Sequence, residues 1–428
     1  MKITFDAWVD AHKDQILAET QAILQIPSVK DDSVGPGAPF GQPCADALTH
    51  TLALCERLGF RVTNFDGYAG HAEFGPEDAP EYVAALGHLD VVPTGDPATW
   101  TIDPFGATVK DGWLFARGAS DDKGPTFAAL FAAKAVMDSG LPLKRRIRLI
   151  LGCDEESGWE CMDHYFGPAD QPKPTYAFAP DADFPLIFAE KGAFTSIIDK
   201  TVSTKVQTMT SGFRANMVPE SATATLTDGT TIMTIGKSAH GSTPEKGENA
   251  AVTLLNKLDE DWANELSHFA AIDGSGLELA GSDLVSGALT CNLGVVKVES
   301  GVASGVINIR YPATWEPAEV EARFEAAITK AGWTIASYKD MPPLYVPVDA
   351  EPVKTLLEVY REHTGDMRPP TAIGGRTYAT AVAPVGVAFG AAMPGDPDVA
   401  HQPDERILVE RLYQCTKIYA DALYRLAQ

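Results

Sequence analysis

The chain has 428 residues, of which 45% are hydrophobic and 21% are charged. This composition is typical of folded proteins, and the length predicts two or three domains rather than one core. The net charge of −24 argues against a nucleic-acid partner, because phosphate binding needs a positive surface. No apolar run approaches about 18 residues, so we expect no membrane partner. The six cysteines lack a disulfide spacing and no signal peptide is visible, which together predict a cytoplasmic protein.

Residues 1–192 alternate between helical and extended patterns. The helices are expected over residues 5–24, 45–58 and 124–138, and the strands over 82–86, 146–152 and 176–179. The basic cluster of Lys144, Arg145, Arg146 and Arg148 is interpreted as a solvated strand edge. This alternation predicts an α/β catalytic domain, in which helices flank a mixed sheet and side chains gather at the carboxyl ends of its strands.

The pattern changes over residues 193–341. Short alternating stretches such as 222–226 and 232–235 predict antiparallel strands, and two helical stretches are expected near 247–267 and 316–331. We interpret this block as an inserted, smaller α+β domain. Residues 342–428 return to the alternating helical and extended pattern of residues 1–192, with a helix over 351–363, an apolar strand at 385–389 and a closing helix from about 405. We interpret them as the second part of the catalytic domain.

Acidic and imidazole side chains follow several of the predicted strands or precede helices. The candidates are His88, Asp90, Asp121, Glu155, Glu156, Asp181 and His401. Each has a plain alternative taken alone: a surface histidine, a helix N-cap aspartate or an exposed acidic turn. Their joint occurrence at strand ends favours one metal site, and carboxylates with imidazoles but no cysteine suit zinc, manganese or cobalt.

Five segments of the sequence also resemble a known family. They are Gly-His-Leu-Asp-Val-Val-Pro (87–93), Arg-Gly-Ala-Ser-Asp-Asp-Lys-Gly-Pro (117–125), Asp-Glu-Glu-Ser-Gly-Trp (154–159), Pro-Asp-Ala-Asp-Phe-Pro (180–185) and His-Gln-Pro-Asp-Glu (401–405). In combination they are similar to PepV-type dinuclear zinc dipeptidases, within the superfamily of aminoacylases, desuccinylases and carnosinases. The resemblance covers nearly the whole chain.

The resemblance implies a role for each candidate. Asp121 would bridge two divalent ions, zinc first, with manganese or cobalt as alternatives. His88 and Asp181 would complete one metal site, and Glu156 and His401 the other. Asp90 would orient His88, and Glu155 would be the general base that activates the water between the metals and then protonates the leaving amine. A cis peptide after Asp121 is also implied.

In the inserted domain the resemblance implies a lid that contributes to the site. His240, in Gly-Lys-Ser-Ala-His-Gly-Ser (236–242), would stabilise the oxyanion. The substrate carboxylate would be held by Asn216, Arg310, Gly374 and Gly375. Two departures from the family stand out: Arg376 replaces an expected glycine, and the lid is shorter than in well-known members. A short lid leaves open a monomer, or a homodimer in which His240 comes from the partner subunit.

The function expected from this pattern is metal-dependent hydrolysis of dipeptides that carry a free carboxylate. An N-acyl-amino-acid amidohydrolase with the same dinuclear site is the alternative. The sequence leaves open the preferred dipeptides and the native metal.

Overall fold

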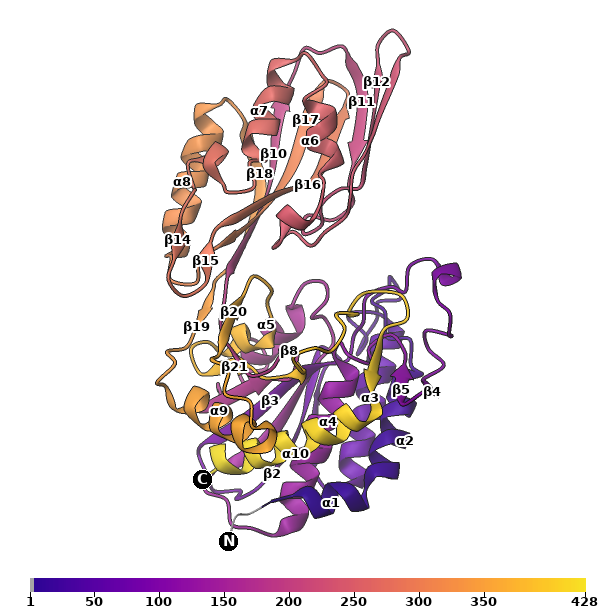
Figure 1. The fold of residues 1–428 in the computed structure, drawn as a ribbon, viewed down its shortest axis with the longest axis vertical. Helices are drawn as coiled ribbons and strands as arrows, with labels where there is room; N and C mark the ends of the chain where they lie inside the picture. Colours follow the sequence, from indigo (N-terminus) through magenta and orange to yellow (C-terminus); the bar gives the residue numbers. More distant parts are fainter. Residues whose placement is uncertain (1–3) are drawn as a thin grey trace. The chain divides into compact units, whose positions relative to one another are not determined.

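A computed structural model describes residues 4–428, which divide into two compact units (Figure 1). Unit 1 comprises Met1–Phe188, Val346–Thr371 and Thr377–Gln428, and unit 2 comprises Ala189–Tyr345 and Ala372–Arg376. The chain passes from one unit to the other after residues 188 and 345, whereas the sequence pattern predicted the domain boundaries after residues 192 and 341. Residues 372–376 group with unit 2, although the sequence placed them in the catalytic domain.

Unit 1 is built from a mixed sheet with helices around it. Its helices are α1 (Asp6–Ala11), α2 (Lys13–Leu24), α3 (Gln42–Arg57), α4 (Lys123–Ser139), α5 (Glu160–Phe166), α9 (Glu351–Thr364) and α10 (Val409–Leu426). Its strands are β1 (Arg61–Phe65), β2 (Ala69–Phe74), β3 (Tyr82–His88), β4 (Thr108–Lys110), β5 (Trp113–Phe115), β6 (Arg146–Gly152), β7 (Tyr176–Ala179), β8 (Ala182–Asp183), β21 (Gly386–Ala388), β22 (Ala391–Ala392) and β23 (Arg406–Leu408). Strands β9 (Ile187–Glu190) and β20 (Thr371–Ile373) lie where the chain passes between units.

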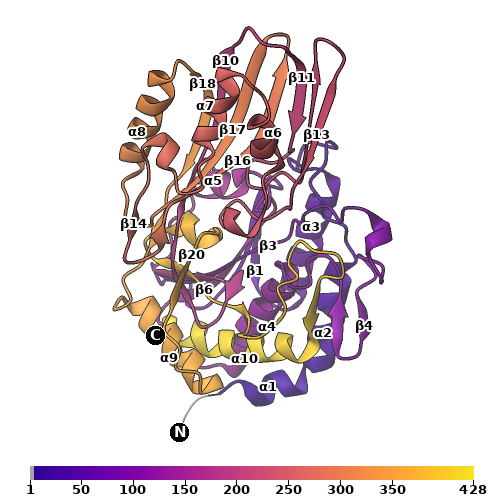
Figure 2. The same ribbon diagram turned by 45° about the horizontal axis from the view of Figure 1, so that its top comes forward.

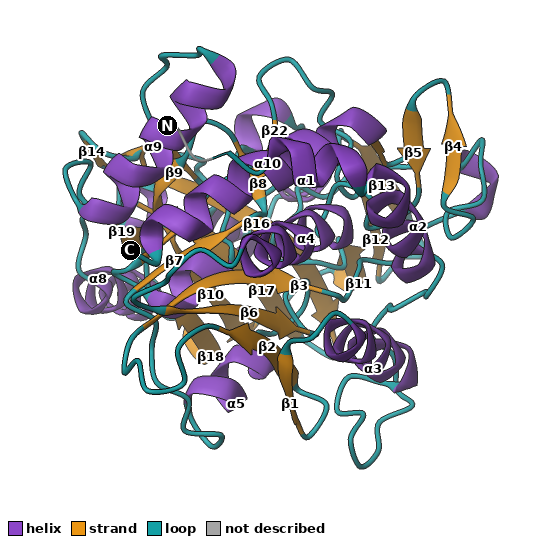
Figure 3. Ribbon diagram, turned by 90° about the horizontal axis from the view of Figure 1, so that it is seen from below, coloured by secondary structure: helices purple, strands orange, loops and turns teal. Residues whose placement is uncertain are grey.

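The main sheet of unit 1 has the order β1-β2-β6-β3-β7-β21-β9. The neighbours β6, β3, β7 and β21 run parallel, and the strands outside them pair in an antiparallel manner. Helices α4 and α10 pack against each other and against β3, whereas α3 and α5 pack against β2. In Figure 3, α4 and α10 lie on one side of β3 and β6, and α5 lies on the other. The parallel strands are therefore buried on both faces, as their apolar sequences predict.

Unit 2 is a smaller α+β unit. Its elements are β10 (Gly192–Thr201), β11 (Val206–Ser211), β12 (Ser221–Leu226), β13 (Thr231–Ile235), α6 (Ala250–Leu255), α7 (Asp261–Phe269), β14 (Ser282–Asp283), β15 (Gly287–Ala288), β16 (Thr290–Glu299), β17 (Val302–Tyr311), α8 (Pro317–Lys330), β18 (Thr334–Met341) and β19 (Leu344–Tyr345). The main sheet is antiparallel, in the order β13-β12-β11-β16-β17-β10-β18. Figure 2 shows α6, α7 and α8 along this sheet, and the core between them includes Trp262, Phe324 and Trp333.

The structure corrects three expectations about the elements. The first helix is two helices that meet at His12. The closing helix begins at Val409 rather than 405, because Arg406–Leu408 forms β23 and pairs with β5. The basic cluster is not a solvated edge: β6 lies inside the sheet between β2 and β3. Arg148 is buried there, 2.8 Å from a Glu73 carboxylate oxygen. The Glu73 carboxylate on β2, rather than solvent, therefore stabilises its charge.

The described residues contain no helix with the length and apolar character of a membrane span.

Candidate metal centre

Four of the candidate side chains lie at the carboxyl ends of neighbouring parallel strands or on the segments that follow them. His88 is the last residue of β3 and pairs in register with Gly152, the last residue of β6. The turn after β6 carries Glu155 and Glu156, and Asp181 follows β7. Because parallel strands end at the same edge of a sheet, these side chains reach a common point.

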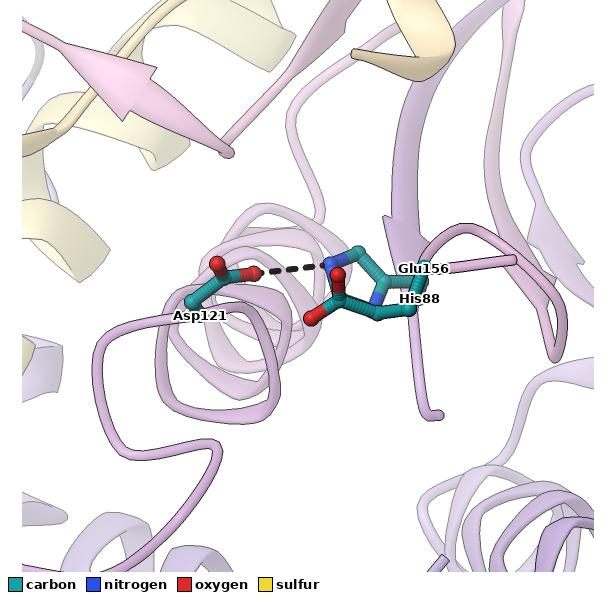
Figure 4. A group of neighbouring side chains, drawn as sticks. All are labelled: His88, Asp121 and Glu156. Carbon is teal, nitrogen blue, oxygen red and sulfur yellow. Dashed lines mark hydrogen bonds and ion pairs between the residues drawn. The ribbon is translucent and has the colours of Figure 1, made fainter. Parts of the chain in front are cut away.

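Asp121 reaches the same point from a different element. It lies just before α4, and the Asp121–Asp122 peptide is cis, as the family resemblance implied. Figure 4 shows its carboxylate directed toward His88, with Glu156 beside them. His401 comes from the loop between β22 and β23 and completes the group. The five predicted ligands, scattered over more than three hundred positions of the sequence, therefore lie together in unit 1.

The distances between these side chains place two of the other predicted ligands on each side of the Asp121 carboxylate. One Asp121 carboxylate oxygen, Oδ1, lies 3.0 Å from His88 Nε2, and the other, Oδ2, lies 2.9 Å from His401 Nε2. His88 Nε2 is also 3.8 Å from Asp181 Oδ2. His401 Nε2 is 3.0 Å from Glu156 Oε1. One side of Asp121 thus faces His88 and Asp181, and the other faces His401 and Glu156, which is the arrangement that a bridging carboxylate requires.

The electrostatics of this group favour added positive charge. Burial and the nearby Asp121 carboxylate raise the pKa of Asp181 well above its usual range, and the same two causes raise the pKa of Glu156. Burial opposes charge on His401 as well, but hydrogen bonds to Asp121 and Glu156 raise its pKa to about 11. Crowded buried acids are costly unless cations lie among them. Oxygen and imidazole ligands without thiolate fit two divalent ions such as zinc or manganese.

Glu155 lies beside the group on the side of His88. Ligand atoms of His88, Glu155 and Asp181 all lie within 4.8 Å of one another, as do those of His88, Asp121 and Glu156. Burial and repulsion from Glu156 raise the pKa of Glu155 well above its usual range. A carboxyl group with a raised pKa close to metal ligands is suited to accept and return a proton.

Asp90 occupies a different position from the one expected. Its carboxylate was predicted to orient His88, but His88 Nδ1 lies 2.9 Å from the Asp90 backbone carbonyl and 3.6 Å from the carboxylate. The Asp90 carboxylate instead accepts hydrogen bonds from the backbone N–H groups of Glu155 and Glu156, both at 3.1 Å. Asp90 therefore fixes the turn that carries the two glutamates, and its backbone fixes the imidazole.

Glu405 is a supporting residue that the sequence reasoning did not identify. Its Oε1 accepts hydrogen bonds from the Ser120 N–H at 3.0 Å and the Asp121 N–H at 3.2 Å. Its Oε2 lies 2.5 Å from Arg117 Nη1, and both side chains are buried. Glu405 stands four residues after His401, so it ties the loop with one candidate ligand to the loop with another. The only sequence signal was its place at the end of the 401–405 motif.

The turn that carries the glutamates is also held by Asp154. This carboxylate is fully buried. It lies 2.8 Å from Lys30 Nζ and accepts a hydrogen bond from the Glu160 N–H at 3.0 Å. The sequence contained Asp154 in a motif but gave it no role.

The candidate residues of unit 2 share a neighbourhood within that unit. Arg310 Nη1 donates to the Gly374 carbonyl at 3.2 Å, and a Cβ added to Gly374 would lie 2.9 Å from Cβ of Ser242. His240 Nδ1 lies 2.7 Å from the Ser242 hydroxyl. The Asn216 carbonyl accepts from the Gly241 N–H at 2.7 Å, which places Asn216 next to the His240 turn. Gly375 follows Gly374 directly.

Arg310 is the most buried charge of this neighbourhood, with 7% of its surface exposed. Burial and the nearby Arg376 lower its pKa to about 10. The described residues offer Arg310 only neutral oxygens within hydrogen-bond distance, on Asn308 and Gly374. A buried guanidinium with these partners is suited to bind a carboxylate. Arg376, the departure from the family, donates through Nη1 to the backbone carbonyls of Met341 and Pro342.

Comparisons with known proteins identify the family and the fold. Residues 84–425 match the pattern of peptidase family M20/M25/M40. The Bacillus subtilis (strain 168) protein YtjP, which carries a provisional dipeptidase name, is 39% identical over 97% of this chain and 98% of its own. Among solved structures, an M20 family metallo-carboxypeptidase of Sulfolobus solfataricus, Sso-CP2, has a TM-score of 0.64 at 18% identity, over 96% of this chain and 99% of that one. Human carnosine dipeptidase 1 has a TM-score of 0.62 at 17% identity, over 99% of each chain.

The solved structures share the fold and confirm the predicted α/β catalytic domain with a smaller α+β domain. The family match and the dipeptidase-named relative confirm the predicted resemblance. The chain therefore belongs to peptidase family M20/M25/M40 and is a metallopeptidase.

Proposed function

We propose that this protein is a metal-dependent dipeptidase that hydrolyses dipeptides with a free carboxylate. The observation that carries the proposal is the position of Asp121, whose two carboxylate oxygens face His88 and His401 separately, at 3.0 Å and 2.9 Å. The dipeptidase name of the B. subtilis relative supports the substrate class. We also propose that the protein is cytoplasmic.

His88, Asp121 and Asp181 would hold one divalent ion, and Asp121, Glu156 and His401 the other. When bound, the two ions, with zinc as our first expectation, supply Lewis acidity that activates water and polarises the scissile carbonyl. Glu155 takes the proton from the attacking water and later returns it to the leaving amine. Asp90 keeps Glu155 in place through the 3.1 Å hydrogen bond to its N–H.

The residues of unit 2 bind the substrate in this proposal. Arg310 binds the substrate carboxylate, assisted by Asn216 and by the backbone of Gly374 and Gly375. His240 donates a hydrogen bond to the developing oxyanion, which carries charge only in the transition state. Either one chain or a partner subunit in a homodimer supplies His240.

A substitution of Glu155 tests the proposal. Glu155→Ala should keep the metal content of the wild type and lower kcat by about 10²–10⁴-fold, because the proton acceptor is lost while the ligands remain. Glu160→Ala is the matched control, since Glu160 is an exposed acid at the start of α5, just after the turn that carries Glu155. Unchanged hydrolysis in Glu155→Ala would remove Glu155 from the mechanism.

A substrate panel separates dipeptides from N-acyl amino acids. Dipeptides, acetylated amino acids and succinylated amino acids with the same carboxyl-terminal residue should be assayed with zinc, manganese or cobalt restored to metal-stripped protein. The proposal predicts the highest kcat/KM for dipeptides. A higher value for the acylated amino acids would replace it with the amidohydrolase alternative.

A further inference from the structure

A cavity of about 770 Å³ adjoins the candidate metal centre, and all of its wall belongs to unit 1. Of the predicted metal ligands, Asp121 and Asp181 line it, and His88, Glu156 and His401 do not. The cavity therefore meets the metal centre on the side of these two carboxylates. Its size is within the range of about 300–1,000 Å³ that is usual for small-molecule sites.

The cavity has an apolar interior that two paired segments frame. Strands β8 and β22 run side by side in parallel register, Ala182 with Ala391 and Asp183 with Ala392, and form one wall. Strand β23 and the segment 393–400 form others. The large apolar side chains of the wall are Trp113, Phe184, Met393, Ile407 and Leu408.

The charged groups of the wall disfavour a negatively charged occupant. Arg368 and Arg411 already have acidic partners, Asp366 at 3.0 Å and Asp396 at 2.7 Å. Arg406 lies over the Trp113 ring at 5.2 Å and donates to a backbone carbonyl. Asp183 and Asp398 line the cavity, and no basic partner for either is found among residues 4–428. Within the described part of the chain, the wall thus carries two carboxylates without a basic partner, Asp183 and Asp398, and one guanidinium without an acidic partner, Arg406.

We propose that this cavity binds the side chain of the amino-terminal residue of the substrate and selects large apolar side chains there. This inference rests on the proposed function. With the scissile carbonyl at the metal centre and the carboxylate on Arg310 in unit 2, the remaining part of a dipeptide is its amino-terminal residue. The adjoining cavity in unit 1 accommodates that residue, and its apolar walls favour leucine or phenylalanine over alanine or aspartate.

Filling the cavity tests the proposal. Ala392→Trp places an indole on the β22 wall, at a residue that is not one of the predicted metal ligands. Val109→Trp is the matched control, because Val109 is exposed on β4 and does not line the cavity. The kcat/KM values for Ala-Leu, Phe-Leu and Asp-Leu, which share one carboxyl-terminal residue, are measured for the wild type and both variants. Circular dichroism verifies folding.

In the wild type we expect Phe-Leu to exceed Ala-Leu by about 10-fold or more, and Asp-Leu to be the poorest substrate. Ala392→Trp should lower kcat/KM for Phe-Leu at least about 10-fold more than for Ala-Leu and so remove this preference, and Val109→Trp should retain it. Leu408→Phe, a smaller change on another wall, should reduce the preference in the same direction if Ala392→Trp does not fold.

An equal loss for Ala-Leu and Phe-Leu, or an unchanged preference in both cavity variants, would overturn the cavity assignment and leave the dipeptidase proposal in place. A wild type that hydrolyses none of the three dipeptides with any of the metals would overturn the proposed function itself, and the cavity assignment with it.

Discussion

Removal of the Glu405 carboxylate should destabilise unit 1 and weaken metal binding together. In Glu405→Ala, Arg117 loses its partner at 2.5 Å while only 1% of its surface is exposed. Breaking a buried ion pair from one side costs about 3–5 kcal/mol, because the remaining charge stays buried without compensation. The N–H groups of Ser120 and Asp121 lose an acceptor as well. The free energy of unfolding should therefore fall by at least that amount.

The same change should lower zinc affinity. Glu405 holds the Asp121 N–H and belongs to the loop of His401, so its loss loosens two candidate ligands. Loss of such a supporting hydrogen bond commonly weakens metal binding by about 10–100-fold. Urea denaturation of metal-free protein gives the stability, and titration against a zinc-binding dye gives the affinity. Glu410→Ala is the control: its carboxylate is exposed and lies 3.2 Å from Lys13, so it should cost about 1 kcal/mol at most.

A double variant identifies the cause of the loss. Arg117→Met combined with Glu405→Ala should be no less stable than Glu405→Ala alone, because the unpaired guanidinium is then absent. The reasoning is refuted if Glu405→Ala and Glu410→Ala lose the same stability and both bind zinc as the wild type does.

Three further predictions concern other parts of the molecule. Asp90→Asn should lower kcat/KM by about 10–100-fold, since an amide N–H₂ cannot accept from both Glu155 and Glu156; steady-state kinetics equal to the wild type would exclude that positioning role. Arg310→Ala should raise KM or lower kcat for dipeptides with a free carboxylate. If the wild type hydrolyses C-terminally amidated dipeptides as fast as free ones, Arg310 does not bind the substrate carboxylate. Burial and Arg148 lower the pKa of His71 from 6.5 to about 3. Between these values the unfolded chain binds a proton that the folded protein does not, so the free energy of unfolding should fall as pH falls, by about 2 kcal/mol at pH 5 from this group. His71→Gln should lack that part of the slope in urea denaturation at pH 7.5 and 5, and an identical slope would contradict the burial of a neutral imidazole.

Local patterns in the sequence predicted the elements that deliver the site. The apolar run at 146–152 and the proline-initiated helix after Asp121 formed as expected, and the acidic turns followed their strands. These features depend on neighbouring residues and on the rule that parallel strands end at one edge, so the sequence contains enough information for them.

Contacts between distant segments could not be predicted in this way. Nothing near Glu405 indicates that its carboxylate meets Arg117, 288 positions away in the sequence. Similarly, Arg148 has the sequence context of an edge strand, and only the pairing of β6 with β2 reveals its Glu73 partner. The helical pattern before Val409 also could not show that β23 would pair with β5. Tertiary pairing determined each of these outcomes.

The proposed function depends on Asp121 joining two metal ions between His88 and His401. Crystals grown with zinc and measured on both sides of the zinc absorption edge test it directly. We expect two anomalous peaks, one on each side of the Asp121 carboxylate, with His88 and Asp181 at one and Glu156 and His401 at the other. A single peak, or peaks that Asp121 does not contact, would contradict it.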